Sequence, residues 1–211
     1  IDVLVLDVKT GSGAFMKREE DAVHLAELMV ETGVRMGKRV VALITDMDQP
    51  LGRYVGNALE IEECIYVMRG EVRNDLSELS IELCAWMFLL GDRVATIEEG
   101  KQLAAQMISS GKALAKFREI VRLQGGDPAT IDDPRLLPKA KSTRDVPSSG
   151  SGFIGTIACE QIGVASCVLG GGREKKEDSI DPAVGIVLHK KRGDRVVTGE
   201  PLCTIHYNGD A

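Results

Sequence analysis

The sequence predicts an α/β protein whose C-terminal part is smaller and rich in short strands. Residues 2–8 and 39–45 are apolar runs on either side of a helical pattern over 19–36. A strand, a helix and a strand in this order are expected to form a right-handed parallel crossover. Between residues 153 and 207, turn residues separate short apolar runs, which is typical of a small sandwich or barrel.

Each predicted helix after the first crossover ends near a glycine, the residue that most readily terminates a helix. A helical pattern over 57–69 follows the second strand, and no strand signal interrupts the next stretch of chain. We therefore expect these helices to flank the sheet. The further predicted helices cover residues 75–91, 96–111 and 112–124.

From residue 124 to residue 152 the chain is rich in glycine, proline and serine, which is the composition of turns and linkers. We place a domain boundary near residue 145, which predicts an α/β domain over 1–144 and a C-terminal α+β domain over 145–211. Within the C-terminal domain, the predicted strands are 153–157, 165–169, 183–188 and 201–206.

Composition and charge exclude several classes of protein. The net charge is −6 and aromatic residues make up only 4% of the chain, so neither a basic face nor a stacking platform for nucleic acid is expected. No apolar run approaches the roughly 20 residues that span a bilayer. The five cysteines form no Cys-x-x-Cys pair, which favours reduced thiols over a zinc site. We expect a cytoplasmic protein with no nucleic-acid or membrane partner.

The stretch from Asp7 to Lys17 combines a strand end, a carboxylate, a lysine, a glycine-rich loop and an aromatic residue before a helix. Lys9 can reach a phosphate or a carbonyl group, or it can be a surface lysine held by Asp7. Asp7 can orient a ligand hydroxyl or bond the loop's N–H groups. The N–H groups of Gly11 and Gly13 are candidates for an anion-binding nest.

The loop over 45–56 follows the second strand, so it is expected at the same sheet edge as the first loop. Asp46, Asp48 and Glu63 raise the question of a cation, because hard cations take carboxylate and carbonyl oxygens. The alternative is that Asp48 caps a helix and that Glu63 lies on a solvated helix face. Spacing alone favours this alternative.

The chain opens with Ile1 and Asp2 and enters an apolar strand at once. Because a domain rarely begins within its core sheet, we expect these residues to be a fragment of a longer protein.

Three blocks of the chain resemble the pyrimidine nucleoside phosphorylase and thymidine phosphorylase family. They are Leu6–Met16, then Thr45–Gly52 with Val55–Glu60, and Gly170–Arg173 with Asp181 and Val184–Gly185. The resemblance implies a large α/β domain with a mixed sheet flanked by helices, followed by a smaller C-terminal α+β domain.

The resemblance also implies a reaction, in which phosphate, as co-substrate, attacks the anomeric carbon of a pyrimidine nucleoside. The products are the free base and a pentose 1-phosphate, and such pentosyltransferases are expected to be homodimers. The family's phosphate-binding Lys-His-Ser-Thr-Gly-Gly segment does not occur in these 211 residues. We therefore expect the fragment alone to be inactive, and we assign no catalytic residue within it.

The resemblance assigns candidate site residues in both loops. Asp7 and Lys9 match the floor of the substrate pocket, and Phe15 and Met16 match positions that line the pyrimidine and the ribose. The second loop matches a site for a monovalent cation, with potassium as the candidate. Two further ligands of that site are not present in the chain, so weak ion binding is expected. The matching ligands are the carbonyls of Leu51 and Tyr54 and the carboxylate of Glu63.

Two other functions remain open from the sequence. The first is a related enzyme of similar fold, either a nucleotide phosphorylase or a phosphoribosyltransferase. The second is a non-enzymatic interaction module, because residues 153–207 resemble the hammerhead-like β modules of biotinyl and lipoyl carriers. The chain lacks the Met-Lys-Met or Asp-Lys-Ala tip of those carriers, which counts against the second function.

Overall fold

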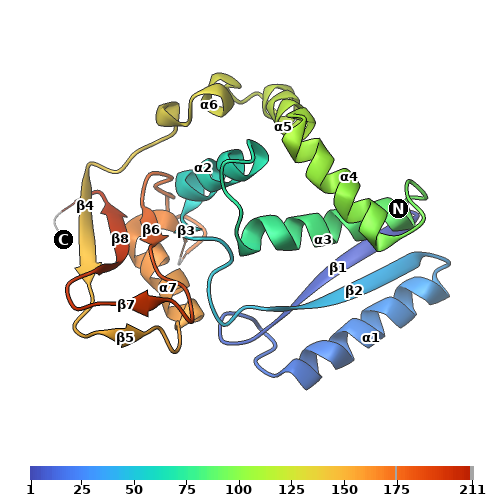
Figure 1. Cartoon of the computed structure of the whole chain (residues 1–211), viewed down its shortest axis with the longest axis horizontal. Coiled ribbons are helices and arrows are strands. Elements are labelled where there is room, and N and C mark those ends of the chain that lie inside the picture. Colours follow the sequence, from blue (N-terminus) through green and yellow to red (C-terminus); the bar gives the residue numbers. More distant parts are fainter. Residues whose placement is uncertain (174, 210–211) are drawn as a thin grey trace. The chain divides into compact units, whose positions relative to one another are not determined.

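The computed structural model describes residues 1–173 and 175–209, and these fold into two compact units (Figure 1). Unit 1 comprises Ile1–Met47 and Val67–Phe117, and unit 2 comprises Asp48–Tyr66 and Arg118–Ala211. Residues 174, 210 and 211, which the predicted C-terminal domain includes, lie outside the described residues. The contacts thus group residues 48–66 with the C-terminal part of the chain. The domain boundary near residue 145 stays a prediction.

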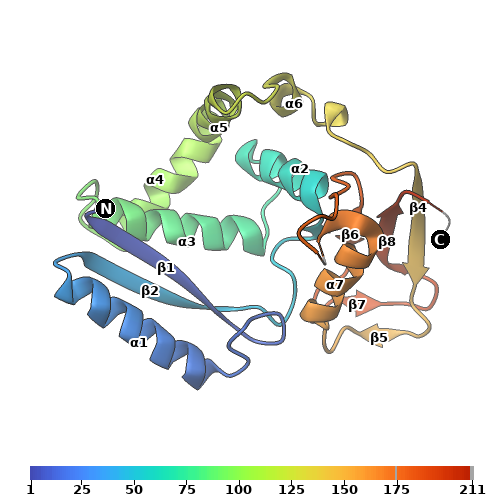
Figure 2. The ribbon, with the colours of Figure 1, turned by 180° about the vertical axis from the view of Figure 1, so that it is seen from behind.

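The predicted strand–helix–strand crossover is confirmed in unit 1. Strands β1 (Val3–Thr10) and β2 (Arg39–Asp46) pair in parallel along their whole lengths, and helix α1 (Glu19–Arg35) connects them. The buried side chains of Ala22 and Ala26 pack α1 against the strands. Figure 2 shows α1 and α3 (Asp75–Leu90) on opposite sides of the two strands. The α/β class is therefore confirmed.

The mixed sheet implied for this part of the chain is not observed among the described residues. The sheet of unit 1 has two strands and is purely parallel. A helical crossover such as α1 joins strands that run parallel, as β1 and β2 do. The antiparallel pairs of this chain lie in unit 2.

The three helices predicted after residue 70 are also confirmed. Helix α3 begins with a capping box, in which Asn74 and Ser77 bond each other's backbone N–H groups. Helix α4 (Ile97–Ser109) packs against α3, and α5 (Lys112–Leu123) follows it. None of the helices formed by the described residues is long and apolar enough to cross a membrane.

Unit 2 contains a four-stranded antiparallel sheet in the order β3-β6-β8-β4. Strand β3 and helix α2, which precede α3 in the chain, join this sheet because β3 pairs with β6. Strands β5 and β7 form a separate two-stranded sheet. The elements of unit 2 are β3 (Tyr54–Val55), α2 (Asn57–Met68), α6 (Ala129–Asp132), η1 (Pro134–Leu136), β4 (Ser142–Pro147), β5 (Gly152–Phe153), α7 (Cys159–Ser166), η2 (Cys167–Gly171), β6 (Gly185–Leu188), β7 (Arg195–Val196) and β8 (Pro201–Tyr207).

Two strands predicted in this part of the chain are wrong or too long. Residues 165–169 form the end of α7 and the π-helical turn η2, not a strand. The apolar run there favours a strand by composition, but a short apolar run cannot by itself distinguish a strand from a helix end. The strand predicted over 153–157 is reduced to the short pair that β5 makes with β7. The strands predicted over 183–188 and 201–206 are confirmed as β6 and β8.

Candidate functional site

The glycine-rich loop after β1 is folded onto the end of β2 by backbone hydrogen bonds. Gly11, with a φ of 108°, donates its N–H to Met16 O at 3.1 Å. Gly13 donates to Met47 O at 2.9 Å, and Met47 in turn donates to Thr10 O at 2.7 Å. The turn at Gly11 needs a residue that tolerates a positive φ, which explains a glycine there.

These bonds correct the expectation of an anion-binding nest. The N–H groups of Gly11 and Gly13 point at carbonyl oxygens of the protein and are already used. A nest requires successive N–H groups that converge on a ligand. The loop therefore serves to shape the chain between β1 and α1.

Asp7 and Lys9 lie on one face of β1 and contact each other. Lys9 Nζ donates to Asp7 Oδ2 at 2.6 Å and to Thr45 Oγ1 at 3.3 Å, and Thr45 Oγ1 donates to Asp7 Oδ1. Both charged side chains are about one-quarter to one-third exposed, at 24% and 34%. The parallel register places Thr45 opposite Lys9, so the cluster joins the ends of two strands. The lysine is thus held by Asp7, and about one-third of its side chain, 34%, stays exposed.

The two apolar candidates of this loop are placed differently from each other. Phe15 is fully exposed, whereas Met16 is half-buried and packs on the cluster around Val8 and Ala22. The exposed aromatic side chain of Phe15 is available to stack on a planar ring. Neither residue lines the cavity of about 220 Å³ that unit 2 contains between α2 and the start of β4.

The second loop encloses a buried carboxylate. Glu63 on α2 is only 2% exposed, so its predicted place on a solvated helix face is wrong. Its carboxylate accepts the backbone N–H of Arg53 at 2.9 and 3.1 Å and the N–H of Tyr54 at 3.2 Å. Gly52 has a φ of +69°, and a Cβ there would lie 2.3 Å from Glu63 Oε2. The carboxylate thus fills the space beside Gly52.

The second loop contains oxygen donors of the kind that hard cations take. It contains one buried carboxylate, that of Glu63, which accepts the N–H groups of Arg53 and Tyr54, and it contains backbone carbonyls. Within residues 1–173 and 175–209, no group of three or more His, Cys, Asp or Glu is placed to hold a metal ion. Burial, followed by the charges of Glu62 and Glu63, raises the pKa of Tyr54. The direction of this shift thus reflects mainly the burial of the Tyr54 phenol.

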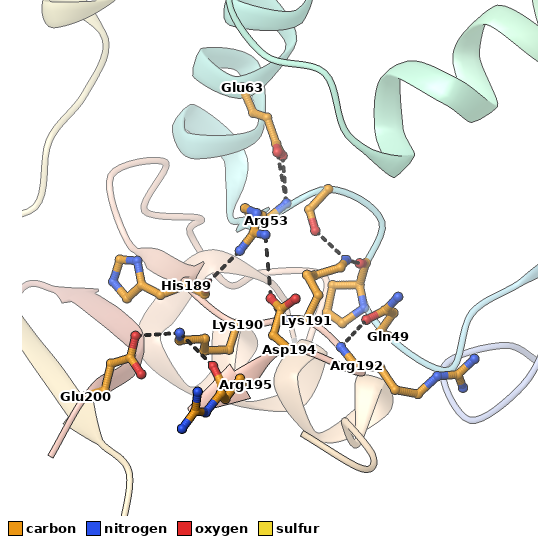
Figure 3. Close-up of polar contacts among 12 residues, drawn as sticks. Gln49, Arg53, Glu63, His189, Lys190, Lys191, Arg192, Asp194, Arg195 and Glu200 are labelled. Carbon is orange, nitrogen blue, oxygen red and sulfur yellow. Dashed lines mark hydrogen bonds and ion pairs between the residues drawn. The ribbon is translucent and has the colours of Figure 1, made fainter. Parts of the chain in front are cut away.

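A turn of residues 189–195, called the hairpin below, connects β6 to β7 of another sheet and contacts the second loop from the side opposite α2 (Figure 3). Arg53 Nη1 donates to His189 O at 2.7 Å, and its Nη2 lies 3.8 Å from Asp194 Oδ2. Lys191 Nζ donates to Pro50 O and, at 2.7 Å, to Gly52 O. The loop is therefore fixed by contacts that no local sequence pattern signals.

The same hairpin also contacts Asp48 and Gln49, at the start of the second loop. Arg192 N donates to Gln49 Oε1 at 3.0 Å, and its guanidinium lies 3.7 Å from Asp48 Oδ2. Asp48 therefore pairs with the hairpin, where the sequence favoured a helix cap. Sequence reasoning missed Thr45, Arg53 and Lys191. The register of β1 and β2 would have indicated Thr45, but nothing local indicates the other two.

Lys190 lies beside Lys191 in the chain but makes different contacts, which predicts a separable effect. Its Nζ lies 2.5 Å from Glu200 Oε1 and donates to Arg195 O. The hydrogen bond from Lys190, then that from Val197 N–H, lowers the pKa of Glu200. We expect Lys190→Met to raise the pKa of Glu200 toward its ordinary value, measured by NMR titration of the side-chain carboxyl carbon, whereas Lys191→Met leaves it unchanged.

The sign of this effect on stability follows from the lowered pKa. A carboxylate whose pKa is lowered by folding stabilises the protein above its unfolded pKa, and this stabilisation is lost as the pH falls through the folded pKa. The Glu200 side chain is about one-third exposed, at 34%, so solvent screens the ion pair and the contribution is small. An unchanged Glu200 titration in Lys190→Met would contradict the assignment.

Comparison with known proteins identifies the family. Residues 1–114 match the model of the glycosyl transferase family a/b domain, and residues 153–211 match the pyrimidine nucleoside phosphorylase C-terminal domain. The chain belongs to the pyrimidine nucleoside phosphorylase family. The first match covers both β1 with its glycine loop and the second loop with Glu63, and the second match covers the hairpin with Lys191.

Two members of the pyrimidine nucleoside phosphorylase family show how far the likeness extends. The pyrimidine-nucleoside phosphorylase of Bacillus subtilis (strain 168) is 48% identical over 207 residues, and that of Staphylococcus aureus (strain USA300) is 49% identical over 207 residues. Each match covers 98% of this chain and 48% of the relative. The chain thus spans about half the length of the curated relatives it matches.

Proposed function

We propose that the chain acts in the phosphorolysis of pyrimidine nucleosides, as one part of a pentosyltransferase. The observation that carries this proposal is its identity of 48% over 98% of its length to a protein named pyrimidine-nucleoside phosphorylase. In this reaction an oxygen of phosphate bonds to the anomeric carbon while the bond from that carbon to the base nitrogen breaks. The products are the free base and a pentose 1-phosphate.

The proposal gives roles to the residues around β1. Lys9, held by Asp7 and Thr45, would bind an anionic or carbonyl oxygen of the substrate. Phe15, fully exposed, can cover the planar base, and Met16 supports the loop behind it. Such an arrangement acts by positioning and charge stabilisation, so it needs no nucleophilic side chain.

We also propose that the second loop is a site for a monovalent cation, with potassium as the candidate. The carbonyls of Leu51 and Tyr54 and the carboxylate of Glu63 would hold the ion. Support comes from the burial of Glu63 and from its position beside the loop backbone. When bound, the ion would supply a positive charge that keeps the loop folded. We further propose that the whole enzyme is a homodimer and is located in the cytoplasm.

The test is phosphorolysis by two polypeptides. The part of the Bacillus subtilis relative outside the matched region is supplied separately, and the release of thymine and uracil from thymidine and uridine is measured. We expect release only in the mixture and only with phosphate, because the chain contains no Lys-His-Ser-Thr-Gly-Gly segment. A mixture of this chain with unrelated protein is the control.

Two outcomes would overturn the proposal. Phosphorolysis by the chain alone at rates near those of the intact relative would show that the 211 residues suffice. Activity of the mixture on nucleoside 5′-phosphates, but not on uridine or thymidine, would favour a nucleotide phosphorylase instead.

A further inference from the structure

Unit 2 contains a cavity that the proposed function does not use. Its volume is about 220 Å³, and its lining comes from helix α2, from residues 134–143, from Ala183 and from strand β8 (Figure 1). None of the residues assigned above to the substrate pocket or to the cation site lines it. An apolar cavity of about 150 Å³ holds a benzene molecule, so a ligand of about eight non-hydrogen atoms fits here.

Much of the lining is apolar and is held in place by the fold. Ala58 and Leu59 of α2 and Ala183 before β6 are all buried. Ala58 N donates to Pro182 O at 2.9 Å, which ties the start of α2 to the segment before β6. Pro134, at the start of η1, is buried as well. The apolar part of the cavity is therefore preformed, as is usual for sites that bind small molecules.

Glu62 brings a negative charge to this cavity. Its side chain lines the cavity and is half-buried on α2, and its Oε1 accepts the Tyr66 hydroxyl at 2.8 Å. Within residues 1–173 and 175–209, this carboxylate has no ion-pair partner. A partly desolvated carboxylate without a positive partner carries an uncompensated cost, which a bound cation would remove. Glu63, the next residue in the chain, bonds the second loop instead.

The other polar side chains of the lining leave Glu62 as the charge that a ligand meets. Thr143 and His206 are paired across β4 and β8, so a hydroxyl and an imidazole lie side by side. Burial lowers the pKa of His206, whereas the charge of Glu62 raises it and the charge of His189 lowers it further. The imidazole is therefore neutral at neutral pH. Lys139 also lines the cavity but is exposed, so water screens its charge.

We propose that this cavity binds a small organic ammonium ion that has an apolar body. The ammonium group bonds the Glu62 carboxylate, and the apolar body packs on Leu59 and Pro134. An anion of the same size would meet the charge of Glu62, and a neutral molecule would leave that charge without a partner. The inference goes beyond phosphorolysis and does not rest on it, because no residue assigned to that reaction lines the cavity.

The test is an NMR titration of the full chain with benzylamine, which is an ammonium ion at neutral pH. Benzyl alcohol and benzoate are the matched neutral and anionic probes. The signal is the Cε1–H resonance of His206, which also gives the pKa of its imidazole. Glu62→Gln removes the charge and keeps an oxygen that accepts the Tyr66 hydroxyl. Glu60→Gln is the matched control, because Glu60 lies on the same helix but bonds Gly56 N–H outside the cavity.

A second variant fills the cavity without changing its charge. Ala140 lines the cavity and is half-buried, so the larger side chain of Ala140→Leu takes up part of its volume. We expect this variant to lose the binding of benzylamine while Glu62 stays charged. The variant therefore tests the location of the site independently of Glu62→Gln.

We expect benzylamine to shift the His206 resonance saturably and to lower the pKa of His206, because the bound ammonium and an imidazolium would repel each other. Benzyl alcohol should bind about tenfold more weakly, since it lacks the charge-assisted hydrogen bond to Glu62. Benzoate should bind more weakly still. In Glu62→Gln, benzylamine should bind no better than benzyl alcohol, whereas Glu60→Gln should behave as the unaltered chain does.

The inference fails if benzylamine and benzyl alcohol bind the unaltered chain equally, because the charge of Glu62 would then play no part. It fails equally if benzoate binds more tightly than benzylamine, which would indicate an anion site at Lys139 and His206. Absence of benzylamine binding, or binding that leaves the His206 resonance in place, also contradicts it. These results are read in the unaltered chain, so they do not require a variant to fold. Since turnover is not measured, failure of the proposed function would leave them unaffected.

Discussion

Replacement of Asp7 with alanine is expected to lower kcat/KM for phosphorolysis about 100-fold in the two-polypeptide assay, because a misplaced catalytic group costs about that much. Asp7 accepts hydrogen bonds from Lys9 and Thr45, so its removal frees both side chains from the end of β1. If Lys9 binds substrate, the loss falls mainly on kcat, since the group is present but poorly oriented.

The control for this variant removes another paired carboxylate of unit 1. Asp92 bonds Arg39 through both oxygens and is exposed to solvent, so Asp92→Ala should leave kcat/KM unchanged. The thermal midpoint of each variant is measured alongside its kinetics. If kcat/KM of Asp7→Ala stays within about threefold of the unaltered protein, neither Asp7 nor Lys9 belongs to the site. A threefold change corresponds to only roughly 0.6 kcal/mol of activation free energy.

Substitution of Gly52 by alanine is expected to destabilise unit 2 by about 3 kcal/mol. About 1–2 kcal/mol of this is the cost of placing a residue with a Cβ in the left-handed backbone conformation, and the rest comes from displacing a hydrogen-bonded carboxylate. The structure places the new Cβ 2.3 Å from Glu63 Oε2, and this carboxylate cannot move easily because it is buried and bonded to the N–H groups of Arg53 and Tyr54. At about 2–4 °C for each kcal/mol, the midpoint should fall by roughly 10 °C.

A matched glycine separates backbone strain from the contact with Glu63. Gly199 has a φ of +84° and nothing within 4 Å of an added Cβ, so Gly199→Ala should show only the strain. In a Glu63→Ala background, the effect of Gly52→Ala should shrink to that of Gly199→Ala, because the colliding oxygen is gone. Such a double-mutant cycle measures the coupling directly. Additive effects of the two substitutions would show that Glu63 does not fill the space beside Gly52.

The sequence predicts the elements of unit 1 well because their signals are local. Alanines at helical spacing, acids in the first turn of α1 and the glycine that follows it all act within a few residues of one another. The strand predicted over residues 165–169 is wrong because an apolar run by itself does not distinguish a strand from a helix end. The turn at Gly170 that ends the helix is visible only in the structure. Strand β3, only two residues long, is visible only through its pairing with β6.

In the candidate site, too, local contacts could be predicted from the sequence and distant contacts could not. The pairing of Asp7 with Lys9 follows from their spacing on one strand, and it was among the two interpretations of Lys9. The burial of Glu63 could not be predicted, because acids on α2 look alike until the loop closes over one of them. Lys191 appears in the sequence as one residue of a short basic run. The residues whose carbonyls it bonds, Pro50 and Gly52, lie 141 and 139 positions earlier in the chain.

The division into two units separates the chromophores of the chain. Trp86, the only tryptophan, lies on α3 in unit 1, whereas Tyr54, Tyr66 and Tyr207, which are all of its tyrosines, belong to unit 2. Selective excitation of the indole therefore follows the melting of the parallel sheet with its helices, and tyrosine absorbance follows the loop and its hairpin. If the two units unfold independently, Gly52→Ala should shift the tyrosine transition and leave the tryptophan transition in place, whereas a joint shift would show that they unfold together.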